Sequence, residues 1–136
     1  MMMEKHSVKG LALVRAQAAA PRILLVRTAP AVHWSLPTTH NGEQLEELIK
    51  RIGTELLPNA SFTCPEGFQR AFELPEAHIE FHLVTTDAEL HPYFESDRFH
   101  DARWASFDEA FYIADIGLEP VIRWSERQSR KVLGHS

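Results

Sequence analysis

The sequence has little cysteine and no excess of basic residues. Cys64 is the one cysteine, so the chain can form neither an internal disulfide bond nor a cysteine cluster for zinc, and we expect a reducing, cytoplasmic location. The formal net charge is −5 and the isoelectric point is about 5.9. This balance excludes a nucleic-acid polymer as an expected partner but leaves room for a small anionic ligand.

Long hydrophobic runs are also absent. The N-terminal residues lack the apolar core of a signal peptide, and no segment approaches the roughly 20 apolar residues that a bilayer-spanning helix needs, so we expect no membrane association. The chain has 136 residues, of which 44% are hydrophobic, enough for a core without disulfides or structural metals. The length predicts a single domain over residues 1–136.

Two short apolar segments near the N-terminus predict buried strands. They are Val8–Val14 and Ile23–Val26. The intervening Ala16–Pro21 has the length of a hairpin connection, so the two strands are expected to pair, in a register that the sequence leaves open. Prolines and a polar run at Thr38–Gly42 then interrupt the pattern.

A helix is predicted from about Gly42 to Leu57. Asn41 is a suitable N-cap, and Pro58 cannot continue the helix. On the polar flank, Arg51 can pair with Glu47 or Glu55. Each such ion pair stabilises a helix by roughly 0.2–0.5 kcal/mol at an exposed site. The apolar residues recur at helical spacing and form one stripe for packing on a sheet: Leu45, Leu48, Ile49, Ile52 and Leu56.

The second half of the chain alternates further strands and helices. Apolar residues flanking a short strand, Trp104 and Phe107, are expected to be core residues. Interleaved strands and helices without repeats favour an α/β (α+β) fold. The expected elements are an antiparallel pair, a short strand and two helices: Phe68–Leu74 with Ile79–Val84, Ala102–Phe107, Asp108–Ala114 opened by Ser106, and Glu119–Val132.

Three sequence features, taken with the order of strands, resemble the Nudix hydrolase family. They are the WSLP turn at Trp34–Pro37, the acidic helix, and RWASFDEA at Arg103–Ala110. The family's box runs Gly, five residues, Glu, seven residues, then Arg-Glu-aliphatic-any-Glu-Glu-any-Gly-aliphatic. Glu43, Arg51 and Glu55 match it. The resemblance covers nearly the whole chain and implies a Nudix-like α/β/α sandwich with a mixed β-sheet.

The box is degenerate at several positions. Thr38 and Thr39 stand where the family commonly has two glycines, and the loop that follows is about two residues short. Burying an aliphatic side chain contributes roughly 1.5–3 kcal/mol, so the two aliphatic residues at the centre of the helix stripe are expected to face the core. The remaining departures are Ile52, Leu56 and Pro58 in place of Glu, Glu and Gly, and Gly53 in place of an aliphatic residue.

By resemblance, helix glutamates hold Mg²⁺ or Mn²⁺ against a diphosphate while water attacks phosphorus. The resemblance makes Glu55, Glu43 and Glu47 the candidate metal ligands. Glu55, Arg51 and Glu43 are the candidate catalytic residues, with Glu43 orienting Arg51 or reaching a second metal. A second registration uses Glu43, Glu46 and Glu47, but it would place the metal ligands too close to the WSLP turn.

Several further residues carry two interpretations. In the family comparison Arg27 faces the phosphates of the ligand, and otherwise it is a surface arginine. Trp34 lines a nucleobase pocket or plugs the sheet edge. Glu73 and Glu76 border the cleft as candidate general bases or are ordinary surface residues.

Two polar groups have a binding and a structural interpretation. Alternation places His78, Glu80 and His82 on one strand face, as a transition-metal site or as a solvated polar face. Basic residues of the last helix either contact phosphates or form a solvated face that complements the helix dipole. These are Arg123, Arg127, Arg130 and Lys131.

Two functions of different classes remain. The first is a weak Nudix-like pyrophosphohydrolase that cleaves a nucleoside diphosphate linked to another group, using Mg²⁺ or Mn²⁺. The second is a non-catalytic module of the same fold that binds a nucleotide-like ligand or another protein chain. Oligomeric state is open, with a homodimer as one option, because fold does not fix function or assembly.

Overall fold

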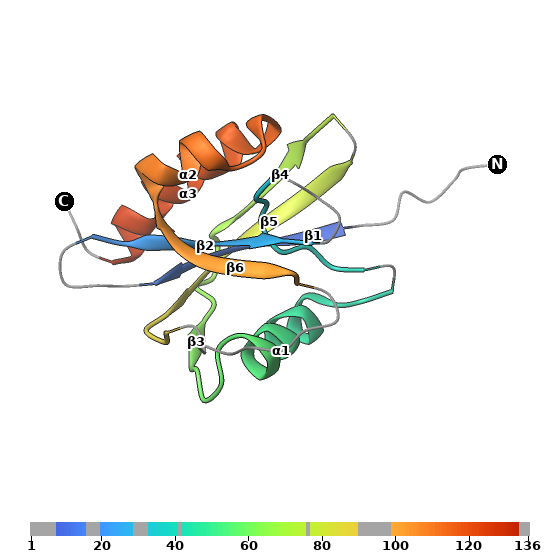
Figure 1. Cartoon of the computed structure of the whole chain (residues 1–136), viewed down its shortest axis with the longest axis vertical. Helices are drawn as coiled ribbons and strands as arrows, with labels where there is room; N and C mark the ends of the chain where they lie inside the picture. Colours follow the sequence, from blue (N-terminus) through green and yellow to red (C-terminus); the bar gives the residue numbers. More distant parts are fainter. Residues whose placement is uncertain are drawn as a thin grey trace.

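The computed structural model describes residues 8–15, 20–28, 33–40, 42–75, 77–89 and 99–133. Figure 1 shows a central sheet with helix α1 on one face and helices α2 and α3 on the other. The architecture is an α/β/α sandwich with a mixed sheet, which confirms the predicted fold class. Two predictions, Asn41 as a helix cap and Glu76 as a candidate general base, concern residues outside the described ranges.

The sheet has the strand order β3-β5-β1-β2-β6, and β4 also pairs with β5. β1 and β5 are parallel, from Val8 opposite Ile79 to Arg15 opposite Thr86, whereas the other pairs are antiparallel. The predicted pairings of the two N-terminal strands and of β4 with β5 are confirmed. The bounds are β1 Val8–Arg15, β2 Arg22–Arg27, β3 Phe62–Thr63, β4 Gln69–Glu73, β5 His78–Thr86 and β6 Asp101–Ser106.

The segment at residues 34–39 lies between two strands that diverge. β1 and β2 are paired only at one end, where Val14 is opposite Ile23. At the other end, Ser35 exchanges two backbone hydrogen bonds of 2.8 Å with Val26 of β2. On the opposite side, the carbonyl of Pro37 accepts a hydrogen bond of 2.9 Å from Leu11 of β1. The WSLP turn is therefore tied to both strands, which satisfies backbone groups that would otherwise be unpaired.

The helices agree with the sequence patterns apart from the ends of the first one. α1 is shorter than predicted and begins after Gln44, whose backbone N–H donates to Glu47 Oε1 at 3.2 Å. Ser106 caps α2 as expected, accepting a hydrogen bond from the Glu109 backbone. The short strand β3 and the 3₁₀ helix η1 were not predicted. The bounds are α1 Leu45–Glu55, α2 Phe107–Ile113, η1 Ile116–Leu118 and α3 Glu119–Val132.

The core is divided by the sheet into two layers. The layer under α1 contains Leu48, Ile52 and Leu56, each fully buried, against the α1-facing side chains of β1 and β2. The layer under α2 and α3 includes Phe107, which confirms this residue as a core anchor, whereas Trp104 is only partly buried and packs against the layer under α1. The structure thus confirms that the aliphatic residues of the degenerate box face inward.

No helix in the described ranges combines the length and the apolar character that crossing a membrane would require.

We expect Ile52→Ala to lower the free energy of unfolding by about 2–5 kcal/mol, because it leaves a cavity between α1 and the sheet. Ile52→Glu should cost more, since a carboxylate there would be buried without a partner. Urea unfolding followed by circular dichroism measures both. Thr54→Glu on the exposed side of the same helix is the control and should change stability by less than about 0.5 kcal/mol.

An Ile52→Glu chain that kept its stability and bound Mn²⁺ tightly would show instead that position 52 faces a cleft.

Candidate functional site

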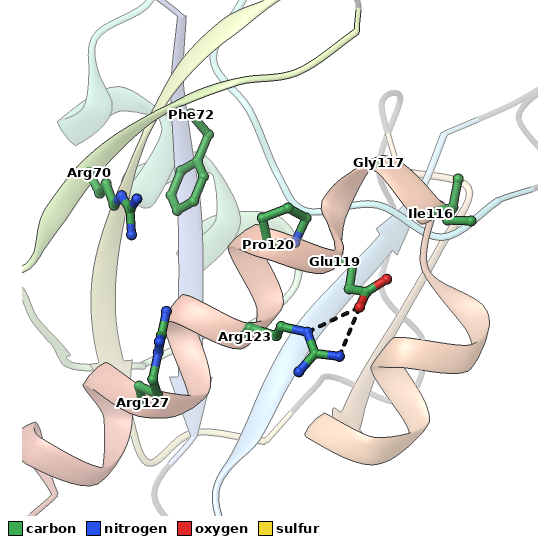
Figure 2. Close-up of a pocket in the computed structure, with 8 residues that line it drawn as sticks. All are labelled: Arg70, Phe72, Ile116, Gly117, Glu119, Pro120, Arg123 and Arg127. Atoms are coloured by element: carbon green, nitrogen blue, oxygen red, sulfur yellow. Dashed lines mark hydrogen bonds and ion pairs between the residues drawn. The ribbon is translucent and has the colours of Figure 1, made fainter.

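Two cavities lie side by side on the α2 and α3 side of the sheet. The inner one, of about 340 Å³, lies between the 34–39 segment, the β4–β5 turn and η1. The outer one, of about 550 Å³, lies between β4, η1 and α3 and is drawn in Figure 2. Ile116 and Gly117 line both cavities, so the two spaces are neighbours.

The inner cavity has an apolar lining with polar groups at its edge. Ile79 and Phe81 of β5 contribute side chains to it. The Phe81 ring lies directly against β1 at Gly10, where an added Cβ would come within 2.3 Å of the ring, so only glycine fits there. Ser35, Thr38 and Asp115 supply the polar part of the lining. An apolar cavity with a few fixed polar groups is the usual form of a small-molecule site.

Asp115 is held in place by backbone contacts. Its N–H donates to the carbonyl of Trp34 at 2.9 Å, and its carboxylate accepts a hydrogen bond from the Gly117 N–H at 3.1 Å. Asp115, Ile79 and Phe81 were not predicted as site residues. Alternation along Ile79–Val84 puts Ile79 and Phe81 on the strand face opposite His78, Glu80 and His82, but nothing local in the sequence indicated that they meet Asp115.

Trp34 is not among the residues that line the inner cavity. Its ring instead lies next to two guanidinium groups, with the Arg27 Cζ 5.3 Å and the Arg103 Cζ 5.8 Å from the ring centre. Arg27 also forms an ion pair of 3.2 Å with Asp101, and Arg103 one of 2.8 Å with Glu109. Two guanidinium groups thus contact the Trp34 ring, and each of them is also paired with a carboxylate.

The three box residues that match the family come together as an ion-pair cluster. Arg51 makes two short contacts with the carboxylate of Glu43, at 2.8 and 2.9 Å, and its Nε lies 3.8 Å from Glu55. Glu43 also accepts a hydrogen bond from the His40 N–H. All three side chains are at least three-quarters buried, so solvent weakens these interactions only partly. The predicted pairing of Arg51 with Glu55 is confirmed.

The alternative pairing of Arg51 with Glu47 is wrong. Glu47 is exposed and accepts a hydrogen bond from the Gln44 backbone at the start of α1, because a carboxylate at this position satisfies a free N–H of the first turn.

The residues present do not fit a divalent metal centre of the usual kind. Within the described part of the chain, no group of three or more His, Cys, Asp or Glu side chains is placed to share an ion. The buried Oε2 of Glu55 has no hydrogen-bond partner, but the nearest charged group is the Arg51 guanidinium, which repels a cation. Mg²⁺ and Mn²⁺ need several oxygen ligands, and here Arg51 already engages both Glu43 and Glu55.

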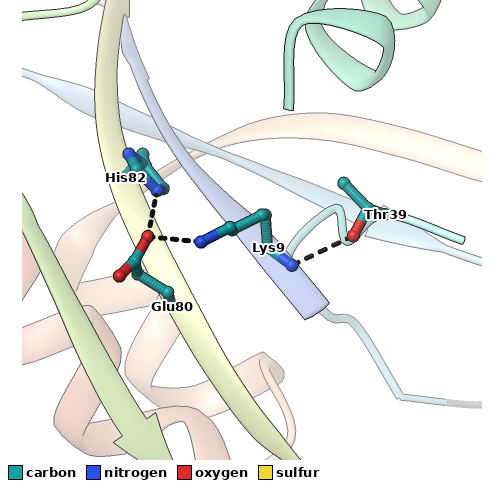
Figure 3. Close-up of polar contacts among 4 residues, drawn as sticks. All are labelled: Lys9, Thr39, Glu80 and His82. Carbon is teal, nitrogen blue, oxygen red and sulfur yellow. Dashed lines mark hydrogen bonds and ion pairs between the residues drawn. The ribbon is translucent and has the colours of Figure 1, made fainter. Parts of the chain in front are cut away.

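A second charged cluster lies on the α1 side of the sheet (Figure 3). Glu80 Oε1 is 2.7 Å from Lys9 Nζ and 2.8 Å from His82 Nε2. The hydrogen bond from Lys9 is the main reason that the pKa of Glu80 lies below its ordinary value of 4.5, with a smaller contribution from His82. His78 contacts Glu73 instead. The three alternating residues of β5 thus form no joint metal site in the described structure.

We expect Glu80→Gln to lower the free energy of unfolding at pH 6 by about 1 kcal/mol, since Lys9 and His82 lose their carboxylate partner. The folded pKa of Glu80 is lowered, so its contribution is present above pH 4.5 and is lost as the pH falls below that value. The difference from wild type should therefore shrink between pH 5 and pH 3 in urea titrations. Glu89→Gln, at a carboxylate that is 78% exposed, is the matched control and should show little effect. A difference that grows on acidification would contradict this assignment.

We expect Arg51→Gln to strengthen Mn²⁺ binding by about tenfold or more, because it removes the cation that engages Glu43 and Glu55. Water-proton relaxation measures the affinity for Mn²⁺ directly. Arg15→Gln removes the same charge from a pair with Glu89, outside the Arg51 cluster, and should leave the affinity unchanged. Tight Mn²⁺ binding by the wild-type chain that weakens on removal of Arg51 would contradict the neutralising role of this residue.

Comparison with known proteins gives structural matches only. No family model and no curated protein sequence matches the chain. An Ap4A hydrolase from C. elegans, solved as a binary complex, superposes with a TM-score of 0.68 at 19% identity over 94% of this chain and 99% of that one. The MutT protein from Methanosarcina mazei Go1 gives 0.61 at 18% identity, over 96% and 98%.

The Nudix domain of Shewanella oneidensis NrtR, solved with ADP ribose, superposes with a TM-score of 0.60 at 12% identity, over 93% of this chain and 90% of that one. These matches cover nearly the full length of each chain, so the agreement extends to the helices on both faces of the sheet. Identities below 20% support the shared architecture and not a shared activity. The chain has the fold of the Nudix hydrolases.

Proposed function

We propose that this chain binds a nucleoside diphosphate linked to another group and hydrolyses it only slowly, as a degenerate member of the Nudix family. The observation that carries the proposal is the inner cavity. Its volume of about 340 Å³ and its apolar lining suit a nucleobase, and Asp115 offers a carboxylate to the exocyclic amino group of a base.

The diphosphate would lie toward Trp34. Ser35 lines the cavity. The guanidinium groups of Arg27 and Arg103 lie over the ring of the adjacent Trp34. Guanidinium groups bind phosphate oxygens through paired N–H donors, and a phosphate would compete with Asp101 for Arg27. This placement keeps Arg27 as a substrate-binding residue and makes Trp34 its support, outside the base pocket.

Slow turnover follows from the charge balance at α1. Glu43 and Glu55 carry two negative charges beside the single positive charge of Arg51, and the fully buried Ile52 and Leu56 add no oxygen ligands. The first role of Arg51 in this arrangement is to hold Glu43 and Glu55 in place. Mg²⁺ or Mn²⁺ would be the metal supplied to a competent site, and its chemistry is to neutralise charge on the phosphates.

The charge balance at α1 also favours a second candidate function, a module of this fold that binds the ligand without cleaving it. The two candidates share the inner cavity and differ only at α1. Neither depends on oligomeric state or on location, and the homodimer and the cytoplasmic location stay predictions.

We expect turnover below about 1 s⁻¹, under the usual range of enzymes, for ADP-ribose, a UDP-sugar and a dinucleoside polyphosphate with Mg²⁺ or Mn²⁺. Product formation is followed by ion-exchange chromatography. Glu55→Gln should lower any residual rate by about tenfold or more if Glu55 serves catalysis, and Thr54→Ala is the neighbouring control. Rates unaffected by Glu55→Gln would remove Glu55 from the site, and binding without any turnover would establish the second candidate.

We expect Ala77→Trp to weaken ligand binding by about tenfold or more, because Ala77 lines the inner cavity and a large ring there would fill it. Calorimetric titration with ADP-ribose in the absence of metal measures the effect. Ala71→Trp is the matched control, since Ala71 is exposed on the same strand pair and lines neither cavity. Equal affinities of the two variants would place the ligand elsewhere.

A further inference from the structure

The outer cavity is lined by three arginines from two different elements, and we call it the arginine groove. Arg70 comes from β4, and Arg123 and Arg127 come from α3. Glu119 is the one acidic residue of the lining, so three positive charges and one negative charge leave the groove at +2. The whole chain has a net charge of −5, which makes this concentration of positive charge unusual for the molecule. The apolar part of the lining is Phe72, Ile116 and Pro120.

The three arginines differ in their partners. Arg123 donates two hydrogen bonds to Glu119, at 2.9 and 3.0 Å. The Arg70 guanidinium lies 5.1 Å from the centre of the Phe72 ring, a contact that leaves its N–H groups available. Within the described residues, neither Arg70 nor Arg127 forms an ion pair. Figure 2 shows Arg123 turned toward Glu119, while Arg70 and Arg127 point toward one another across the groove.

The position of Arg127 on α3 is electrostatically unfavourable. Its neighbours one helical turn away in each direction, Arg123 and Lys131, are both basic. Like charges at this spacing destabilise a helix, whereas the Glu119–Arg123 and Glu126–Arg130 pairs on the same helix have the favourable arrangement. Arg70 adds a further positive charge from across the groove. Glu119 offsets part of the charge of Arg123, but no described carboxylate pairs with Arg127, and a bound anion would relieve the remaining repulsion.

The chemistry of the lining selects the kind of anion. Two guanidinium groups that face each other match the several oxygens of a phosphoryl group, which accepts paired hydrogen bonds from each. Pro120 and Ile116 provide an exposed surface on which a ring can lie, and Ile116 is 87% exposed, whereas Phe72 is buried, with the Arg70 guanidinium 5.1 Å from the centre of its ring. A free phosphate would use only the first feature, whereas a phosphate ester of an aromatic alcohol would use both.

We propose that the arginine groove is a binding site for small phosphate monoesters, with the phosphoryl group between Arg70 and Arg127 and the ring over the exposed Pro120. The site is separate from the one proposed for the nucleoside diphosphate and does not depend on it. The two cavities share a wall at Ile116 and Gly117.

The test uses the full chain, with inorganic phosphate and phenyl phosphate as probes at constant ionic strength. Binding is followed by ¹H–¹⁵N correlation spectra, in which the amides of Arg70, Phe72 and Arg127, which line the groove and not the inner cavity, report on the groove. We expect both probes to shift these amides and phenyl phosphate to bind at least threefold more tightly. We expect the Arg70→Gln, Arg127→Gln double variant to weaken phenyl phosphate binding by at least tenfold.

The matched control is Arg130→Gln, which removes one positive charge from the same helix outside the groove. It should leave binding within twofold of wild type. Arg127→Gln alone should also raise the melting temperature in phosphate-free buffer, because it removes repulsion from Arg123 and Lys131, and should reduce the stabilisation that phosphate gives. The thermal measurement uses the single Arg127→Gln variant, so it still tests the groove if the double variant folds poorly.

The proposal is overturned if phenyl phosphate leaves the groove amides unshifted, or if the double variant and Arg130→Gln bind it equally well. Shifts confined to residues around Arg27 and Trp34 would place the phosphate at the nucleoside diphosphate site and would also overturn it. The failure of the proposed function, by contrast, would appear in the Ala77→Trp comparison with ADP-ribose. The two outcomes are therefore distinguishable.

Discussion

Packing of α1 against the sheet is the constraint on which the candidate site depends. Ile52 and Leu56 are fully buried beneath the sheet, which sets the rotation of the helix about its own axis. With 3.6 residues per turn, that rotation places Arg51 and Glu55 on one flank of the helix and turns Glu47 outward. A family glutamate at position 52 or 56 would have to leave this interface, so the burial that stabilises the domain also removes two oxygen ligands.

The charges that remain on α1 stabilise one another. Arg51 contacts Glu43 through two short interactions and Glu55 through a longer one, all in partly buried surroundings. Such a cluster holds the loop before α1 against the helix, but it does so by using the carboxylates that a cation would need. On the same side of the sheet, Lys9, Glu80 and His82 form another internally balanced group. The α1 face is therefore charged but largely neutralised.

The opposite face of the sheet has the reverse character. There the inner cavity is apolar, and the groove next to it contains arginines without carboxylate partners among the described residues. Surface charge that is not paired within the protein is available to a ligand, whereas charge that is paired must first lose its partner. The unpaired charge is therefore the reason that the proposed phosphate monoester site lies on the α3 side.

Much of this organisation is local in origin and could be predicted. Helical spacing identified the buried stripe of α1, Ser106 marked the start of α2, and alternation located β5, because each pattern depends only on residues close in sequence. The tertiary structure decided three further features. They are the parallel pairing of β1 with β5, the insertion of the WSLP turn between the diverging β1 and β2, and the shared lining of one cavity by Phe81 and Asp115. The tertiary structure also decided the approach of Arg70 to Arg127, which a local pattern cannot specify, because contacts between distant segments form only when the whole sheet has assembled.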